Sequence, residues 1–492
     1  MATTATTATA PTPADCAARA QGMVDFLNAA CSNFHAVAES KRRLVEAGYQ
    51  ELSERSVWSL KAGGKYFFSR NASALVAFAI GEKYKPGNGM YMIGTHTDSP
   101  CLKLKPVSKT SSVGIQQIAV QTYGGGLWTT WFDRDLGIAG RVLVREEKGL
   151  KQHLVRIDRP ICRIPMLAIH MARGTGTKFE LNTENHLKAV LCSEAEAALN
   201  STATADDSNP SHANSAHHSA LLDVIAAEIG VDVKDIEDVE LQLTDVQPST
   251  VGGLFGEYIF SGRIDNLSSC YTSLAALIES TTSPDSLAEE TGVRLIVHFD
   301  HEEVGSNSAP GAQGPLVADA LKRIVAEFES SSEDASVYER TIQSSFMISA
   351  DCSHAIHPNY PGKHESKHRP GINAGVVLKH NANQRYATTS IGASIYRECA
   401  RISQTPTQEF VVRQDMGCGS TIGPITAGNI GVNTIDIGMP QWSMHSIRES
   451  MGSKDPEYCV RQFKTYFENA ARLVTSIDVD TTTTAPKRVA PL

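Results

Sequence analysis

The 492-residue sequence lacks several features that would place it in a specialised class of protein. No apolar run reaches the roughly 18 residues that a membrane-spanning helix needs. Lys and Arg together number 45 against 54 Asp and Glu, so the chain has no basic surplus that would attract nucleic acid or an anionic lipid surface. We therefore expect neither nucleic acid nor a membrane as a main partner.

Cysteine pairing and a secretory signal are also missing. The ten cysteines are scattered and form no Cys-x-x-Cys pair, so neither a thiolate zinc site nor a disulfide framework is indicated. The first fifteen residues are mostly Ala, Thr and Pro, without the basic segment and apolar core of a secretory signal. We expect a reducing compartment, most simply the cytosol, with disordered tails at residues 1–20 and 481–492.

The pattern of apolar and polar residues changes twice along the chain. Residues 21–100 and 250–480 alternate short apolar runs with amphipathic segments, which is typical of an α/β domain. Residues 101–249 carry short β-rich runs separated by glycines, which predicts a β-rich domain inserted into the first. Within the insert, the run Gly124-Gly125-Gly126 lacks a phosphate-loop pattern and is interpreted as a flexible segment.

A second stretch of the insert, residues 194–219, is of low complexity and predicts a mobile loop. It contains His212, His217 and His218, which could hold a metal but are expected to be solvated loop histidines. No function follows from this stretch.

Three apolar runs end in residues that can bind a metal. Residues 293–299 predict a buried, parallel strand and lead into Asp300-His301-Glu302-Glu303. Residues 90–94 lead into His96 and Asp98, and residues 346–350 lead into Asp351. Adjacent carboxylates at the end of a buried strand repel each other and lose hydration, and a cation would reverse that cost.

Each of these elements also has an ordinary structural explanation. The Glu302-Glu303 pair could lie in a solvated loop, and His96 and Asp98 could form a hydrogen-bonded loop pair. Asp265 could cap the helix that the following residues predict. Their joint placement favours a site, because ligands of open α/β sheets bind beyond the carboxyl ends of the strands.

The complete set comprises two histidines, three carboxylates and a spare glutamate, which suits two zinc ions that share one carboxylate. Imidazole ligands favour zinc over magnesium. The predicted members are His96, Asp265, Glu302, Glu303, Asp351 and His445.

Five motifs resemble those of the aspartyl aminopeptidase family of metallopeptidases, and the resemblance extends from about residue 20 to 475. The motifs are Gly94-Thr95-His96-Thr97-Asp98-Ser99-Pro100, Gly262-Arg263-Ile264-Asp265-Asn266, Asp300-His301-Glu302-Glu303-Val304-Gly305-Ser306, Ala350-Asp351-Cys352-Ser353-His354-Ala355 and Met444-His445-Ser446-Ile447-Arg448-Glu449. The resemblance implies a mixed central sheet flanked by helices, as in zinc exopeptidases, with the insert serving as a dimerisation or lid domain.

The resemblance also implies a reaction, the release of an N-terminal Asp or Glu from a peptide. It implies that His96, Asp265 and Asp351 hold one zinc ion, and that Asp265 is shared with a second zinc ion held by Glu303 and His445. Glu302 would be the general base.

Further roles follow from the same family. Asp98 would orient His96, and His170 would reach the site of a neighbouring subunit and stabilise the oxyanion. The substrate's acidic side chain would meet Lys379, with His354 and Tyr386 beside it, although Lys379 could equally be an exposed lysine without a role.

The family also implies a homo-oligomer, a dodecamer built from dimers, and some relatives are carried to the vacuole in that form. Two other functions remain open on the residues alone. One is a metal-dependent deacylase or carboxypeptidase on a related sheet, and the other is a non-catalytic oligomeric scaffold. The intact set of ligands together with Glu302 favours the peptidase.

Overall fold

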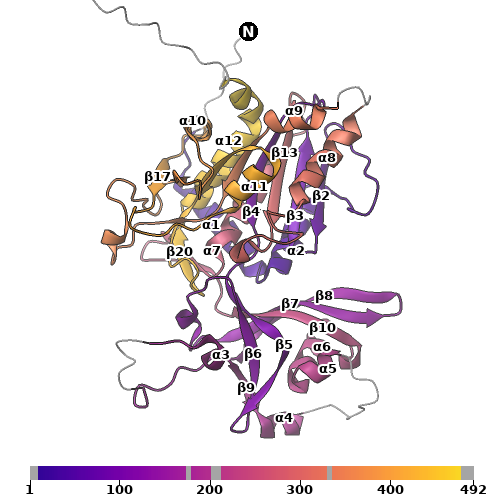
Figure 1. Ribbon diagram of the computed structural model, residues 1–492, viewed down its shortest axis with the longest axis vertical. Coiled ribbons are helices and arrows are strands. Elements are labelled where there is room, and N and C mark those ends of the chain that lie inside the picture. Colours follow the sequence, from indigo (N-terminus) through magenta and orange to yellow (C-terminus); the bar gives the residue numbers. More distant parts are fainter. Residues whose placement is uncertain (1–8, 173–178, 201–211, 330–334, 478–492) are drawn as a thin grey trace, which may run out of the picture.

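The computed structural model describes residues 9–172, 179–200, 212–329 and 335–477, and they form two stacked parts (Figure 1). The upper part holds a large sheet between helices. The lower part is a second sheet with its own short helices, and all its strands come from residues 101–245. The α/β class and the mixed central sheet that the sequence predicts are confirmed.

The central sheet has nine strands in the order β1-β2-β3-β13-β4-β14-β18-β16-β17. Its strands are β1 Gln50–Glu51, β2 Lys65–Arg70, β3 Ala74–Ile80, β4 Met90–His96, β13 Val293–Phe299, β14 Phe346–Ala350, β16 Val376–His380, β17 Thr407–Val411 and β18 Asn433–Gly438. The middle strands β13, β4, β14 and β18 run parallel to one another, whereas β3 and β16 flank them in the antiparallel direction. The carboxyl ends of the four parallel strands therefore meet at one edge.

These strands are continuous apolar runs because both faces of the sheet are covered. In β13, for example, Ile296 packs into one hydrophobic cluster while Leu295 and Val297 pack into the other. One face is covered by α1 Pro13–Ala29, α2 Asn33–Glu46, α7 Ile264–Glu279, α10 Ser390–Ser403 and α12 Asp455–Thr475. The other face is covered by α8 Leu316–Phe328, α9 Val337–Gln343 and α11 Ile422–Ile430.

The inserted part has a six-stranded sheet in the order β8-β7-β10-β5-β6-β9, and a hydrophobic cluster of its own. Its strands are β5 Cys101–Ser112, β6 Ile115–Tyr123, β7 Leu136–Glu146, β8 Gly149–Cys162, β9 Ala189–Ser193 and β10 Ile236–Asp245. Its helices are α3 Thr183–His186, α4 Glu194–Asn200, α5 His212–Ala216 and α6 Ser219–Ile229.

A third, five-stranded sheet lies next to the carboxyl edge of the central sheet and has the order β11-β12-β20-β19-β15. Its strands are β11 Thr250–Gly252, β12 Tyr258–Ser261, β15 Ser353–His354, β19 Pro440–Trp442 and β20 Glu449–Gly452. The segments that leave β12 and β19 carry Asp265 and His445, so this small sheet brings two distant parts of the chain together.

The predicted boundary of the N-terminal tail is wrong. Residues 13–20 belong to α1, which begins at Pro13 and not after residue 20. The Thr12 hydroxyl accepts a hydrogen bond from the Asp15 amide, and the Asp15 carboxylate accepts one from the Thr12 amide, which completes a capping box. Residues 1–8 and the predicted tail at 481–492 lie outside the described residues.

The predicted mobile loop at 194–219 contains helices α4 and α5, and residues 201–211 lie outside the described residues. His217 and His218 are buried, contrary to the expectation of solvated loop histidines. The Ser108 hydroxyl lies 2.8 Å from His217 Nδ1, and His218 Nε2 lies 2.9 Å from the Thr110 carbonyl oxygen. Both imidazole rings are therefore packed inside the insert.

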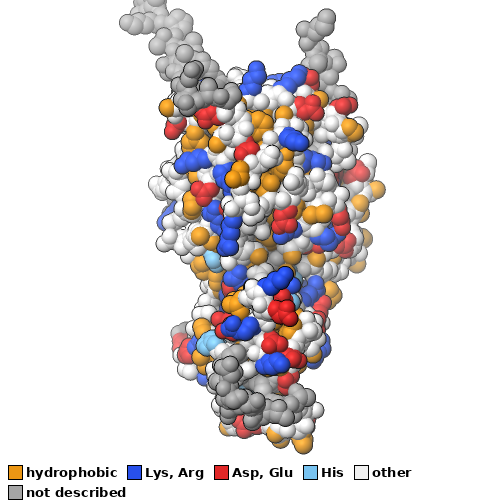
Figure 2. All heavy atoms as spheres, turned by 90° about the vertical axis from the view of Figure 1, so that its right-hand side faces the viewer, with side chains coloured by type: hydrophobic (Ala, Val, Ile, Leu, Met, Phe, Trp, Pro, Cys, Tyr) orange, Lys and Arg blue, Asp and Glu red, His pale blue; other side chains and the backbone are white. Residues whose placement is uncertain are grey.

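The surface shows the balance of charge that the composition implies. Basic and acidic side chains are interspersed over the face in Figure 2, without a field of one sign. Among the described helices, none combines the length and apolar character that crossing a bilayer requires. All ten cysteines are free thiols, and most are buried.

Candidate metal centre

The carboxyl edge of the parallel strands gathers the acidic and histidine side chains. His96 is the last residue of β4, Asp351 follows β14, and Glu302 lies in a short turn just after β13. Because these three strands are neighbours in the sheet, residues far apart in the sequence meet at the same edge. Asp265 enters from the start of α7, and His445 from the loop after β19.

A first group of three ligands surrounds His96, which is buried. Its Nε2 lies 3.4 Å from Asp265 Oδ1 and 3.7 Å from Asp351 Oδ1. One ligand atom from each of the three residues lies within 4.8 Å of the others. These are the three residues that the family resemblance assigns to one zinc ion.

A second group uses the other oxygen of Asp265. His445 Nε2 lies 3.5 Å from Asp265 Oδ2 and 3.3 Å from Glu303 Oε2. The three residues again offer atoms within 4.8 Å of one another. The backbone is non-helical at Asp265 and Asn266, and the Asp265 carboxylate lies between the two histidines.

The donor set fits cations, because the carboxylates are buried without enough partners. Asp265 Oδ1 and Glu303 Oε1 are buried, and neither has a hydrogen-bond donor among the described residues. Burial together with the neighbouring acids raises the pKa of Glu302 to about 8 and raises that of Glu303 as well. A bound cation would relieve this repulsion, so a divalent metal suits the cluster.

Glu302 forms a third group with His96 and Glu303, whose atoms also lie within 4.8 Å of one another, and it adds one carboxylate to the two groups that share Asp265. Its side chain is 16% exposed, and its Oε2 lies 3.9 Å from His96 Nε2. The solvated loop that the Glu302-Glu303 pair could have formed is excluded, since the Glu303 side chain is only 4% exposed. An acid that is left over beside two groups of ligands is available for proton transfer.

Asp98 has more contacts than the orientation of His96 requires. Its carboxylate lies 3.4 Å from His96 Nδ1 and accepts hydrogen bonds of 3.1 Å from the main-chain amides of Glu302 and Glu303. It also accepts a 2.6 Å hydrogen bond from the hydroxyl of Tyr123, the last residue of β6 in the insert. Despite burial, these donors keep the pKa of Asp98 below its usual value.

The glycine run of the insert, which was interpreted as a flexible segment, contacts the site. His445 Nδ1 lies 2.9 Å from the carbonyl oxygen of Gly125, which fixes the tautomer with Nε2 free for a metal. The Leu127 amide donates to the His445 carbonyl oxygen at 2.9 Å. A side chain at Gly124 would press on Glu303, whose Cβ lies 3.1 Å from the place of an added Cβ.

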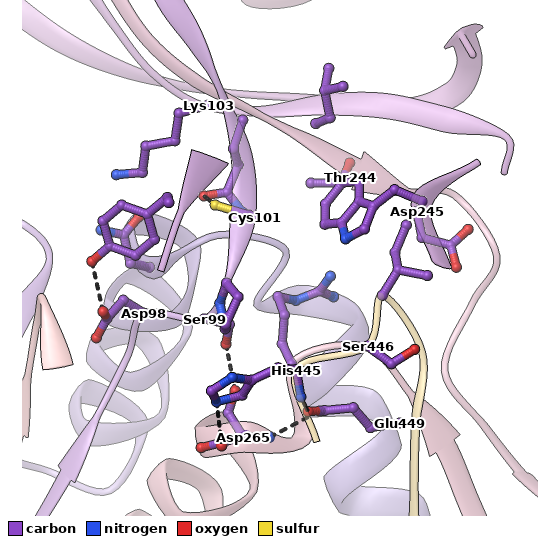
Figure 3. A pocket seen from close by; sticks show the side chains of 18 of the residues that line it. Asp98, Ser99, Cys101, Lys103, Thr244, Asp245, Asp265, His445, Ser446 and Glu449 are labelled. Atoms are coloured by element: carbon purple, nitrogen blue, oxygen red, sulfur yellow. Dashed lines mark hydrogen bonds and ion pairs between the residues drawn. The ribbon is translucent and has the colours of Figure 1, made fainter. Parts of the chain in front are cut away.

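The sequence analysis missed two residues of the site, Tyr123 and Glu449. Glu449 is buried at the start of β20, and its carboxylate lies next to Asp265 and His445 (Figure 3). Glu449 does end the last family-like motif, which was the only available signal. Tyr123 carried no signal, because it contacts Asp98 only once the insert is folded.

The three residues expected to meet the substrate's side chain lie beyond Asp351. Lys379 is 2% exposed, so it is not the exposed strand-end lysine that was the alternative. Its ammonium donates to Asp351 Oδ2 at 3.3 Å and to the Cys352 carbonyl at 3.1 Å, and it lies 4.9 Å from the ring centre of Tyr386. His354 lines a cavity of about 260 Å³, where its ring meets that of Phe410 edge-on.

His170 is not brought to the site of its own chain. It lies in an exposed turn of the insert, after β8, and forms no ion pair or hydrogen bond with the described site residues. Its apolar neighbours Met166, Leu167, Ile169 and Met171 are exposed as well. A surface of this kind is available to another chain.

Comparisons with known proteins identify relatives of this chain. A family model described as aminopeptidase I zinc metalloprotease (M18) matches residues 26–467. A protein of Ricinus communis named "Probable aspartyl aminopeptidase" is 50% identical over 477 residues, which cover 93% of this chain and 96% of the relative.

Two solved structures have the same fold over almost the whole chain. The structure described as a cryo-EM structure of the Ape4 and Nbr1 complex matches with a TM-score of 0.91 at 42% identity, covering 95% of this chain and 89% of that one. The structure of the Saccharomyces cerevisiae mApe1 dodecamer matches with a TM-score of 0.82 at 31% identity, covering 93% and 98%.

Proposed function

The chain belongs to the M18 family of zinc metallopeptidases, and on that premise we propose that it is a two-zinc aminopeptidase that releases N-terminal Asp or Glu from peptides. The resemblance to aspartyl aminopeptidases is confirmed by the relatives that carry this name. The observation that carries the two-metal proposal is the pair of three-residue ligand groups that share Asp265.

His96, Asp265 and Asp351 would hold one zinc ion, and Asp265, Glu303 and His445 the other. Zinc at these ligands supplies Lewis acidity, which polarises a peptide carbonyl and acidifies a water molecule. Glu302 takes the proton of the attacking water on its carboxylate and then delivers it to the leaving amine. Asp98 holds the main chain of Glu302 and Glu303 in place and orients His96.

The preference for an acidic first residue is assigned to Lys379, with His354 and Tyr386. Lys379 is a buried cation beside Asp351, and a cation at this place would lower the cost of bringing a substrate carboxylate to the site. His170 of a neighbouring chain is assigned to the oxyanion, since its own chain leaves it exposed and away from the metal ligands.

An assembly follows from the role of His170. We propose a homo-oligomer, a dodecamer built from dimers through the inserted part, in keeping with the dodecamer of the yeast relative. We place the protein in a reducing compartment, most simply the cytosol, because all ten of its thiols are unpaired.

The direct test is the hydrolysis of substrates with N-terminal Asp, Glu and Leu by wild type and by Glu302→Gln, with zinc measured on both. We expect cleavage of the acidic substrates, and a loss of kcat of about 10²- to 10⁴-fold in Glu302→Gln with the zinc content unchanged. Cleavage of N-acyl amino acids in place of peptides would indicate a deacylase. A folded protein with neither activity nor zinc would indicate a scaffold.

A further inference from the structure

Glu449 connects two metal ligands that lie 180 residues apart in the sequence. It is 2% exposed, and its two carboxylate oxygens have different partners. Oε2 accepts a 3.1 Å hydrogen bond from the main-chain amide of Asp265, and Oε1 accepts a 2.9 Å hydrogen bond from the main-chain amide of His445. One rigid carboxylate therefore spans the backbones of two ligands of the same predicted zinc ion (Figure 3).

The five-stranded sheet explains why Glu449 lies at this point. Strand β20 lies between β12 and β19, with Glu449 opposite Ser261 and Ser450 opposite Trp442. The chain leaves β12 four residues before Asp265, and it leaves β19 three residues before His445. Glu449, the first residue of the middle strand, therefore faces both departing segments.

The backbone of these two segments needs such support. His445 has a φ of +67°, and Arg263, two residues before Asp265, has a φ of +61°. Residues other than glycine and asparagine rarely adopt this left-handed conformation, and they persist in it where their surroundings hold them. Hydrogen bonds from amides to a buried carboxylate are among the stronger ones in proteins, and here they hold both segments.

The other contacts of the second ligand group do not replace this link. The insert holds the ring and the carbonyl of His445 through Gly125 and Leu127, and Asp98 holds the amide of Glu303. Among the described contacts, only Glu449 joins the backbone of Asp265 to that of His445.

We propose that Glu449 is a positioning residue that sets the spacing between Asp265 and His445, and through it the zinc affinity of the second site and the rate of the reaction. The inference rests on the proposed two-zinc function. Glu449 does not touch substrate or metal in this role. It acts only through the two amides.

The test compares intact wild type with Glu449→Gln and with Glu457→Gln. Glutamine offers one acceptor oxygen and turns an NH2 group toward the other amide, so one of the two links is lost. Glu457 is also a buried carboxylate, but it pairs with Arg19 and Arg461 and with none of the predicted metal ligands, so it serves as the matched control. The measurements are zinc affinity by chelator competition, kcat and KM with zinc in excess, and the melting temperature without zinc.

We expect Glu449→Gln to weaken the binding of zinc by about 10- to 100-fold, as other residues that support metal ligands do. We also expect kcat to fall more than KM changes, and activity to recover in part as zinc is raised. Glu457→Gln should lower the melting temperature and leave the zinc affinity within twofold of wild type. Glu449→Asp, which keeps the charge but is too short to span both amides, should give an intermediate zinc affinity.

The proposal is overturned if Glu449→Gln or Glu449→Asp binds zinc and turns over as wild type does. It is also overturned if Glu449→Gln melts earlier with an unchanged zinc affinity, since that is a purely structural effect. If Glu449→Gln does not fold, Glu449→Asp alone decides by the same criteria. A wild type without zinc binding or aminopeptidase activity would instead refute the proposed function, and the inference with it.

Discussion

At the scale of single residues, the account depends on acids that are buried next to one another. Asp265, Glu303 and Asp351 lie within reach of two histidines, and the shared Asp265 offers one oxygen to each. Without a cation the arrangement is costly, because like charges at short range raise one another's pKa. For example, burial and the neighbouring Asp265 carboxylate raise the pKa of Glu303 well above its usual value.

Lys379 supplies the first prediction. Replacing it by Ala removes a buried cation beside Asp351, so kcat/KM for substrates with N-terminal Asp or Glu should fall at least ~30-fold further than kcat/KM for a Leu substrate. The change in the ratio of the two kcat/KM values is the measurement. An equal loss on both substrates would show that Lys379 only holds Asp351 in place.

The residues also show what sequence can and cannot reveal. His96, Glu302, Glu303 and Asp351 were predictable because each lies at or shortly after the end of an apolar strand, where a histidine or an acid stands out against its neighbours. Glu449 could not be predicted from the sequence, because it binds main-chain amides, and almost every residue has such an amide. Thr12-Pro13-Ala14-Asp15 carries a capping box, but the surrounding Ala, Thr and Pro composition obscured it.

At the scale of elements, the insert completes the catalytic part of the chain. The end of β6 and the glycines after it supply Tyr123 to Asp98 and Gly125 to His445. The contacts of these residues depend on the fold of the insert, so neither spacing nor composition predicts them. The interpretation of Gly124-Gly125-Gly126 as a flexible segment did not anticipate these contacts for this reason.

Tyr123→Phe tests this coupling. It removes one hydrogen bond to a buried carboxylate, which is worth ~1.5–3 kcal/mol, so kcat/KM should fall roughly 10- to 100-fold while the melting temperature changes little. Tyr360→Phe, at an exposed tyrosine, is the control and should behave as wild type. A fully active Tyr123→Phe enzyme would show that Asp98 does not need the insert.

Strand β13 carries a pH dependence of stability. His298 is buried between the sheet and α7, with Nε2 3.0 Å from the Ser273 hydroxyl, and burial lowers its pKa from 6.5 to about 3. Between these values the unfolded chain binds a proton that the folded chain does not. The contribution of neutral His298 to the free energy of unfolding is therefore full well above pH 6.5, and it declines as the pH falls toward 3.

Lowering the pH from 7 to 5 should cost wild type ~2 kcal/mol of stability at His298, and His298→Gln should not show this part of the loss. The measurement is the difference in melting temperature between pH 7 and pH 5 for each protein. His186→Gln, at an exposed histidine, is the control and should show the wild-type difference. Equal differences for wild type and His298→Gln would contradict the assignment.

At the scale of the whole molecule, one chain leaves an exposed apolar turn around His170 and a metal centre that this histidine does not reach. Light scattering on the intact protein should give a mass near twelve times that of the 53.0 kDa chain. The mass should fall when Ile169 in this turn is replaced by Asp, since a charge there opposes apolar contact. A monomer mass for wild type would reject the assembly and the role of His170 together.

Sequence could supply the α/β class and the insert because strands and β-rich runs have local patterns. The sequence could not show that the apolar residues around His170 are exposed, because a single sequence does not distinguish apolar residues that are buried within one chain from those that are exposed on it. The expected oligomer and the role of His170 in it came from the resemblance to the family, and the comparisons support that resemblance over residues 26–467.

The proposed mechanism requires two zinc ions that share Asp265. Anomalous diffraction at the zinc edge, from crystals grown with zinc, tests it most directly. The account predicts two peaks per chain on either side of the Asp265 carboxylate, one beside His96 and Asp351 and the other beside Glu303 and His445. A single peak, or peaks away from Asp265, would contradict it.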